Sequence, residues 1–415
     1  MRKNILFCEV VILYRYINKI MVLSLFLLFF ITHTFAYEDD SEVLDLTGEE
    51  WLATSTSYEK EPQILSKVAL AYDRTYKKIL YEKNMYEKVP NASTTKILTA
   101  IVAYENSTLE EIVVVSRRAA AIGGSRIGLI SGDKISMQDL LKGLLLSSGN
   151  DAAIAIAEHV GGSVENFCDM MNEKAKTLGA TSTHFTSPHG LDNEEHYTTA
   201  NDLLIFTEYL LNIDYLAKLV DLKEAAIKMG ERTKNIRSTN EMHSIYEEVN
   251  GVKTGFTNKA GRCLVTSIKR NNRELIIIVL GADTKKQRTL ETIQLINYGI
   301  NNFEEVDLYE KMKKQFPVFV EKSKDKRYEI LISGEKMTLL KKGDAGKVRY
   351  EYDLVNRFVA PIEKGENLGK ISIFLEKELL NIVNLENDCR IERKRVDEYL
   401  EEIIKNKLKY IEFAQ

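Results

Sequence analysis

Cysteine is scarce in this chain, and neither sign of charge is in excess. Four cysteines occur in 415 residues; Cys8 lies in the apolar N-terminus, which leaves Cys168, Cys263 and Cys389. An odd number of widely spaced cysteines in a chain of this size favours packed thiols over disulfides or metal ligands. The formal net charge of -4, from 57 basic and 61 acidic side chains, gives no electrostatic reason to expect a nucleic-acid partner.

Repeats, low-complexity tracts and metal-binding motifs are also missing. His184, His189, Asp192 and His196 lie in one stretch, but their spacing does not match the His-Glu-x-x-His pattern of a helical zinc site. We therefore expect neither a metal nor a cofactor. The 44% hydrophobic and 28% charged content describes an ordinary globular protein, and the length predicts a large domain with a smaller one.

The N-terminus has the pattern of an export signal. Basic residues, Arg2 and Lys19 among them, precede an apolar run over residues 20–31. The small residue Ala36 follows a few positions later, and acidic residues come directly after it. This pattern predicts a secretory signal peptide over residues 1–36. An uncleaved anchor stays open, because apolar residues 5–13 lengthen the segment.

Hydrophobic periodicity predicts an α+β domain over residues 37–305. Strands are expected early and late in this domain, with a block of helices between them, which favours a mainly antiparallel sheet. The expected strands cover residues 67–72, 76–83, 252–256, 263–268 and 275–280, and the expected helices residues 137–146, 151–160, 164–178 and 290–300, with others starting at Ser93 and near Thr199.

Short β-rich runs between charged turns predict a small β-rich domain over residues 306–388. The tail, residues 389–415, is expected to form an amphipathic helix from about Ile391, because its apolar residues recur at spacings of three and four. Its charges are nearly balanced. The helix therefore lacks a strongly basic face. Three roles stay open for it: it can lie on a membrane surface, pack on the β domain or bind a partner.

Candidate nucleophiles come from the Ser-x-x-Lys motif, which by itself says little because it starts at Ser57, Ser93, Ser131, Ser323 and Ser333. Only Ser93 stands where a strand-rich segment passes into a convincing helix. A helix start offers unpaired N–H groups, and Lys96 would lie one turn on, within reach of the hydroxyl. A buried lysine with a lowered pKa can take the proton of such a serine.

Two further motifs follow in order. Ser148-Gly149-Asn150 stands between two expected helices, where a hydroxyl can relay a proton and an amide can bind a peptide group. Ser238-Thr239-Asn240 has the same form and acts as a decoy. Lys253-Thr254-Gly255 occurs once, in an expected strand, where the two side chains suit an anionic terminus and the glycine admits another backbone.

The three motifs in this order match the pattern of penicillin-binding proteins and serine β-lactamases. Flanking stretches narrow the match: the chain resembles the D-alanyl-D-alanine carboxypeptidases among the low-molecular-mass penicillin-binding proteins. These stretches include residues 90–96, 184–192, 196–202, 250–257 and 260–264, and residues 360–369 resemble that family's C-terminal β domain. The resemblance implies a β-lactamase/transpeptidase-like catalytic domain followed by that β domain.

The resemblance also implies an acyl-enzyme mechanism on a peptidoglycan stem peptide. Ser93 would attack the penultimate D-alanine with Lys96 as its base, and Ser148 would carry the proton to the leaving D-alanine. Asn150 would bind the substrate backbone, and Lys253 and Thr254 would bind its terminal carboxylate. Gly255 would leave room for the substrate backbone. The N–H groups of Phe256 and Ser93 would form an oxyanion hole.

The same resemblance implies that β-lactam antibiotics inhibit the enzyme covalently and that the enzyme works outside the cytoplasmic membrane. Two alternatives stay open. A serine β-lactamase is disfavoured because the middle motif reads Ser-Gly-Asn and the chain carries an extra β domain. A catalytically silent peptidoglycan-binding scaffold is the other, although all three motifs are intact.

Overall fold

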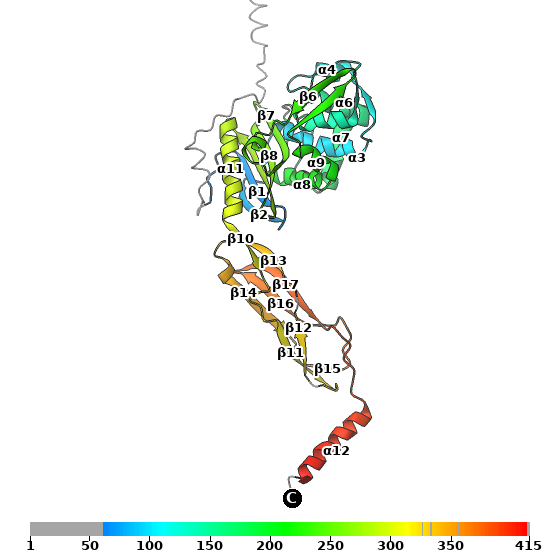
Figure 1. Cartoon of the computed structure of the whole chain (residues 1–415), viewed down its shortest axis with the longest axis vertical. Helices are drawn as coiled ribbons and strands as arrows, with labels where there is room; N and C mark the ends of the chain where they lie inside the picture. Colours follow the sequence, from blue (N-terminus) through cyan, green and yellow to red (C-terminus); the bar gives the residue numbers. More distant parts are fainter. Residues whose placement is uncertain (1–60, 326, 333, 356, 413–415) are drawn as a thin grey trace, which may run out of the picture.

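The computed structural model describes residues 61–412 other than 326, 333 and 356. The expected signal peptide lies outside these residues. In Figure 1 a larger α/β body leads into a narrow β domain, and the last helix, α12, lies at the end away from the larger body. We describe the larger body, the β domain and the C-terminal tail in turn.

A five-stranded antiparallel sheet forms the centre of the larger domain, in the order β2-β1-β9-β8-β7. Asn271 and Asn272 both have positive φ, at 53° and 62°, and make the tight turn between β8 and β9 that the sequence predicts. The strands are β1 (Val68–Asp73), β2 (Lys78–Lys83), β7 (Val249–Thr257), β8 (Gly261–Arg270) and β9 (Arg273–Ala282).

Both faces of this sheet are covered, which explains why β9 is an almost unbroken apolar run. Ile276, Ile278 and Leu280 face the cluster formed by the helical block, whereas Ile277 and Val279 join the cluster under α11 (Lys285–Asn301). Successive side chains of a strand point to opposite faces, so each face receives every second residue. The sheet is thus the middle layer between α11 and the other helices (Figure 1).

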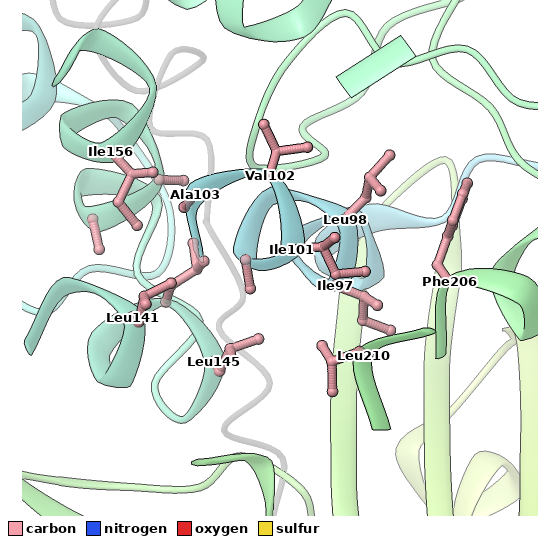
Figure 2. Packing of buried hydrophobic residues seen from close by; sticks show 14 of the residues in the cluster. Ile97, Leu98, Ile101, Val102, Ala103, Leu141, Leu145, Ile156, Phe206 and Leu210 are labelled. Carbon is pink, nitrogen blue, oxygen red and sulfur yellow. The ribbon is translucent and has the colours of Figure 1, made fainter. Parts of the chain in front are cut away.

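Helix α3 (Lys96–Glu105) lies inside the helical block, and its residues 96–103 are all buried. A helix that is buried on every side needs apolar residues all around it. Its neighbours supply Leu141, Leu145 and Phe206 to the core that Figure 2 shows. The other helices of the block are α5 (Met137–Leu145), α6 (Asn150–Gly161), α7 (Val164–Thr177), α8 (Ala200–Leu211) and α9 (Asp214–Asp221).

Shorter elements complete the larger domain. The first four residues of the α3 region form a separate 3-10 turn, η1 (Ala92–Thr95), which carries Ser93. The other shorter elements are two small two-stranded sheets and two short helices: β3 (Ile112–Val114) with β4 (Lys134–Ser136), β5 (Glu224–Met229) with β6 (Arg232–Arg237), α4 (Arg117–Ala121) and α10 (Met242–Ile245).

The β domain contains three small sheets, with strand orders β10-β13, β12-β11-β15 and β14-β16-β17. Leu339 of β13 packs into the α11-side core of the larger domain and accepts a hydrogen bond from Lys78 Nζ at 2.9 Å through its carbonyl. The elements are β10 (Phe303–Asp307), β11 (Gln315–Glu321), β12 (Arg327–Leu331), β13 (Met337–Lys341), η2 (Ala345–Lys347), β14 (Val348–Leu354), β15 (Arg357–Val359), β16 (Asn367–Leu375) and β17 (Glu378–Glu386).

The α+β class, with its antiparallel sheet and helical block followed by a β-rich domain, is confirmed. The start of the C-terminal helix at Ile391 is wrong, since α12 covers Val396–Glu412. Ile391 is instead buried in the β domain, where its backbone pairs with Ile362. Within the described part of the chain, no helix has the length and apolar character needed to cross a membrane.

Candidate active site

Ser93 is held in η1 by a compact set of local hydrogen bonds. The buried Asn91 donates through Nδ2 to the hydroxyls of Thr94 and Thr95, at 3.0 and 3.1 Å. Those hydroxyls donate in turn to the carbonyls of Asn91 and Ala92, at 2.7 and 2.8 Å. Ala92 has a φ of 47°, which is rare for a residue with a side chain and often marks a functional turn.

Lys96 is the first residue of α3 and is 0% exposed. Its amine makes three hydrogen bonds: to Ser93 Oγ at 2.7 Å, to Asn150 Oδ1 at 2.7 Å and to the His189 carbonyl at 3.0 Å. Three acceptors match the three N–H groups of an ammonium. A neutral amine has two N–H groups and one lone pair. Because the two carbonyl oxygens have no hydrogen to donate, that lone pair must face the Ser93 hydroxyl.

The surroundings of Lys96 favour this neutral form. Burial lowers the pKa of the Lys96 amine well below its usual value, Lys253 lowers it further, and Asp151 opposes both. Burial likewise lowers the pKa of His189 to about 3, with the charge of Lys96 adding to the effect. A neutral amine that accepts a hydrogen bond from a serine hydroxyl has the geometry of a nucleophile and its general base.

The middle motif contributes Asn150, the first residue of α6, directly to this group. Its Oδ1 accepts from Lys96, and its Nδ2 donates to the Gly123 carbonyl at 2.9 Å. Ser148 is buried two residues earlier with a φ of 58°. In the described residues no hydrogen bond joins its side chain to Ser93 or Lys96, so Asn150, but not Ser148, is hydrogen-bonded to the pair.

The third motif lies on β7, the edge strand of the sheet. Lys253 and Thr254 are buried, and Lys253 Nζ donates to the Thr254 carbonyl at 2.9 Å. At Gly255 a Cβ atom would come within 2.9 Å of Ser93 N, which is closer than real Cβ contacts. Glycine is therefore what lets β7 lie directly against η1. The next residue, Phe256, has its ring 3.9 Å from the guanidinium of Arg262.

The histidine-rich stretch supports η1 from the other side. Gly190 has a φ of +84°, and a Cβ there would stand 1.9 Å from the Ala92 carbonyl oxygen. His196 Nδ1 accepts from the Thr186 N–H at 3.1 Å, which leaves Nε2 as the donor to Thr95 Oγ1 at 2.8 Å. Among residues 61–412 with their three gaps, no cluster of His, Cys, Asp or Glu side chains suits a metal ion.

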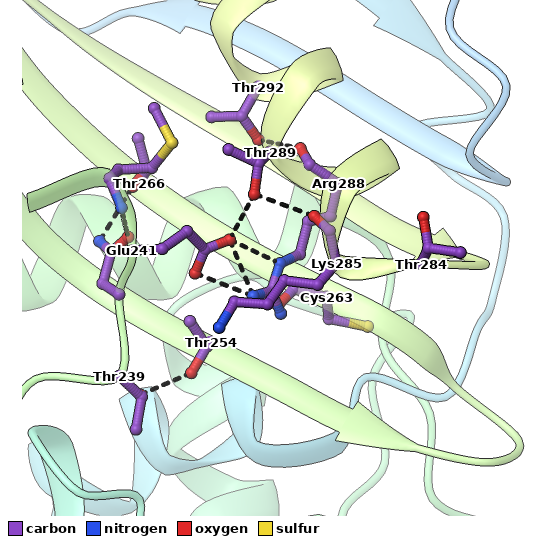
Figure 3. A network of polar contacts seen from close by, with 12 residues as sticks. Thr239, Glu241, Thr254, Cys263, Thr266, Thr284, Lys285, Arg288, Thr289 and Thr292 are labelled. Carbon is purple, nitrogen blue, oxygen red and sulfur yellow. Dashed lines mark hydrogen bonds and ion pairs between the residues drawn. The ribbon is translucent and has the colours of Figure 1, made fainter. Parts of the chain in front are cut away.

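Sequence reasoning missed a support behind β7. Thr239, in the decoy motif, shares a hydrogen bond of 2.6 Å with Thr254 through their hydroxyls, and Asn240 Nδ2 donates to the Gly251 carbonyl at 2.8 Å. The adjoining Glu241 forms a buried ion pair with Arg288 of α11 at 2.8 Å (Figure 3). On sequence alone we dismissed Ser238-Thr239-Asn240 as a decoy and assigned it no structural role.

Comparison with known proteins finds a family match for each of the two domains. Residues 55–284 match the D-alanyl-D-alanine carboxypeptidase family, and residues 303–393 match the penicillin-binding protein 5 C-terminal domain. The D-alanyl-D-alanine carboxypeptidase DacF of Bacillus subtilis is 33% identical over 367 residues, which cover 87% of this chain and 90% of the relative. DacC of Escherichia coli is 34% identical over 336 residues, or 76% and 81% of the two chains.

Solved structures agree with the sequence relatives. Penicillin-binding protein 5 from Haemophilus influenzae superposes with a TM-score of 0.65 at 27% identity, over 81% of this chain and 100% of that one. With two family matches in the right order and relatives along most of its length, this chain belongs to the D-alanyl-D-alanine carboxypeptidases, a family of serine hydrolases.

Proposed function

We propose that this enzyme removes the terminal D-alanine from peptidoglycan stem peptides through an acyl-enzyme formed on Ser93. One observation carries the proposal: the Ser93 hydroxyl lies 2.7 Å from the amine of Lys96, which is fully buried. A serine is a weak nucleophile until a base takes its proton, and this amine is the base within reach. The family relationship supports the substrate.

In the proposed reaction, Ser93 Oγ attacks the carbonyl carbon of the penultimate D-alanine while its proton passes to Lys96 Nζ. The carbonyl oxygen becomes an oxyanion, which the backbone N–H groups of Ser93 and Phe256 would stabilise. The amide bond then breaks, and the proton reaches the amine of the departing D-alanine by way of Ser148. Water attacks the ester in the same manner, which releases the shortened peptide and restores the hydroxyl.

Substrate binding is assigned to β7 and the start of α6. Lys253 and Thr254 would bind the terminal carboxylate, since a buried ammonium and a hydroxyl suit such an anion. Asn150 has a second amide hydrogen beyond the one given to Gly123, and this hydrogen can bind the peptide backbone. A β-lactam presents a similar amide and carboxylate, so it should acylate Ser93 and remain bound.

Replacing the nucleophile tests the mechanism. The Ser93→Ala variant should fold normally, lose covalent labelling by penicillin, and release D-alanine about 10⁴-fold more slowly or worse. Lys96→Ala should also fail to acylate. The matched control is Ser131→Ala, which removes an exposed serine of another Ser-x-x-Lys motif and should label fully. Labelling that persists in Ser93→Ala would show that the nucleophile lies elsewhere.

One assay separates the carboxypeptidase from the β-lactamase alternative. Muropeptides incubated with the enzyme should lose one alanine by mass spectrometry, while nitrocefin should be turned over slowly. Rapid nitrocefin hydrolysis without release of D-alanine would reverse the assignment. A scaffold protein would show neither activity nor a covalent penicillin adduct.

We propose further that the signal peptide exports the enzyme across the cytoplasmic membrane. The enzyme would then contact the outer face of that membrane through α12. Five apolar side chains of this helix are each more than half exposed: Val396, Leu400, Ile403, Ile404 and Leu408. A stripe of this kind supports binding at a lipid interface.

A further inference from the structure

Asp151 is a buried carboxylate beside the active site to which the reaction gives no role. It follows Asn150 in the first turn of α6 and is 0% exposed. Burying a charge is costly unless other groups compensate it. In the described part of the chain no lysine or arginine forms an ion pair with Asp151, so the compensation must come from hydrogen bonds.

Those bonds come from the backbone of one neighbouring segment. Oδ1 accepts from the N–H of Ile127 at 3.0 Å, and Oδ2 accepts from those of Gly128 and Leu129, at 2.8 and 3.0 Å. The N–H of Ala152 adds a fourth bond, to Oδ1, at 3.0 Å. Every partner is an N–H donor, so a protonated carboxyl would have no acceptor for its own hydrogen among them, and the contacts favour the ionised carboxylate.

The same segment also contacts Asn150. The Asn150 N–H donates to the Ser125 carbonyl at 2.7 Å, and its Nδ2 donates to the Gly123 carbonyl at 2.9 Å. The first of these two bonds joins the backbone at the start of α6 to the segment, and the second fixes the amide whose Oδ1 binds Lys96. Residues 123–129 are therefore joined to α6 through Asn150 and Asp151 together. The position of the Asn150 amide depends on this attachment.

We propose that Asp151 is a positioning residue of the active site, whose carboxylate holds residues 127–129 against the start of α6 and keeps a fixed negative charge beside Lys96. The proposal rests on the proposed function, because it needs Lys96 to act as the base. In the described residues Asp151 makes no hydrogen bond to Ser93 or Lys96, and it would act through Asn150 and through its charge.

The charges that face Lys96 explain why such an anion is useful. Lys253 on β7 lowers the pKa of Lys96, and Asp151 on α6 raises it. From the histidine-rich stretch come His189 and His196, with pKa values lowered by burial to about 3 and about 4, so both are neutral near pH 7. Asp151 thus stabilises the ammonium that forms when Lys96 takes the Ser93 proton, without contacting it.

The test replaces the charge while keeping the shape. The Asp151→Asn variant of the full chain should lose activity, and the acidic limb of its kcat/KM profile for D-alanine release should move to lower pH by about one unit. The direction follows because Lys96, without the nearby anion, gives up its proton more easily. Lost positioning of residues 127–129 alone would lower activity without moving that limb.

Asp202→Asn is the matched control. Asp202 is also a buried carboxylate near the start of a helix, and it accepts from the Ser182 N–H at 2.8 Å and the Thr183 hydroxyl at 2.8 Å. Its loss should lower the thermal midpoint, as the loss of Asp151 should, but leave the acidic limb in place. An unmoved limb in Asp151→Asn, or an equal movement in both variants, would overturn the proposal.

Two further results would also bear on the role of Asp151. If Asp151→Asn does not fold, the smaller Asp151→Ser takes its place; failure of both, with folded Asp202→Asn and Asp202→Ser, would make Asp151 a purely structural residue and refute the proposal. The wild-type enzyme tests the underlying function separately. If it releases D-alanine in a Ser93-dependent way, an unmoved limb counts against Asp151 alone.

Discussion

At the scale of single residues, the site depends on close approaches between backbone segments. η1 is enclosed between Gly255 of β7 and Gly190 of the histidine-rich stretch, and a Cβ atom at either position would meet backbone atoms of residues 91–93. Ser93 is thus fixed by two neighbours that have no side chain. The proposed nucleophile is aligned by backbone contact as well as by its own helix turn.

Gly190 offers a direct test of this alignment. Gly190→Ala should destabilise the fold by about 3 kcal/mol or more, because a strained φ is combined with a clash against the Ala92 carbonyl. Gly179→Ala is the control, since Gly179 has a similar φ of +86° but open space around it, and should cost about 1 kcal/mol. Urea unfolding measures both values, and equal losses would contradict the role given to close approach.

The buried histidines predict how stability changes with pH. Burial lowers the pKa of His196 to about 4, below its ordinary 6.5, so the unfolded chain binds the proton more readily between these values. His196 therefore makes the free energy of unfolding fall by up to about 1.4 kcal/mol for each pH unit between 6.5 and 4. Its stabilising effect is complete above pH 6.5.

His196→Gln removes this titration and should flatten the pH dependence by about 1 kcal/mol per unit, whatever it does to stability at pH 7. Urea unfolding of both proteins at pH 6.5, 5.5 and 4.5 measures the two slopes. Parallel curves would mean that His196 does not titrate on unfolding in this range.

At the scale of helices and strands, local sequence predicts well and distant contacts do not. The β8–β9 hairpin follows from Asn271-Asn272 between apolar runs, and α3 follows from its own periodicity. The pairing of Thr239 with Thr254 is invisible in sequence, because a loop and a strand bring the two hydroxyls together. The predicted start of the C-terminal helix was wrong for a related reason. Ile391 fits the helical spacing of apolar residues, but it is buried in the β domain instead.

The ion pair between Arg288 and Glu241 helps to hold α11 against the segment behind β7, together with a hydrogen bond from the Thr289 hydroxyl to Glu241 at 2.9 Å. Both side chains are nearly inaccessible, at 0% and 6% exposure. Arg288→Met should destabilise the protein by about 3–5 kcal/mol, because it leaves the Glu241 charge buried without its partner.

A double-mutant cycle separates the pair from its surroundings. Glu241→Met combined with Arg288→Met should cost less than the sum of the two single losses, measured by urea unfolding. Strictly additive losses would show that the two side chains stabilise the fold independently.

At the scale of the whole molecule, the β domain separates the active site from α12, which lies at the opposite end in Figure 1. The two domains meet where Lys78 donates to Leu339 and where Leu339 enters the core under α11. Among the described residues, Val249 at the start of β7 belongs to that core, whereas η1 and the Lys253-Thr254-Gly255 motif do not. We therefore expect catalysis and the proposed membrane contact to lie at different ends of the chain.

Truncation after Arg395 tests this division of roles. The shortened chain should release D-alanine from a soluble peptide at the full rate, but should no longer sediment with phosphatidylcholine vesicles, which test the apolar stripe without a charge attraction. Leu400→Ser with Ile404→Ser, in the full chain, should have the same effect on sedimentation while keeping the helix length. Equal sedimentation of all three proteins would exclude α12 as the membrane contact.

The hydrogen bonds of Lys96 have a consequence for isotope exchange. Two of its three partners are carbonyl oxygens, which cannot hand a hydrogen on, and the amine itself is closed to water. In the substrate-free enzyme, deuterium from the solvent therefore enters the amine by way of the Ser93 hydroxyl. An acyl group on that oxygen would remove this route, and the water that attacks the ester would then be the group that gives a solvent hydrogen to the same amine.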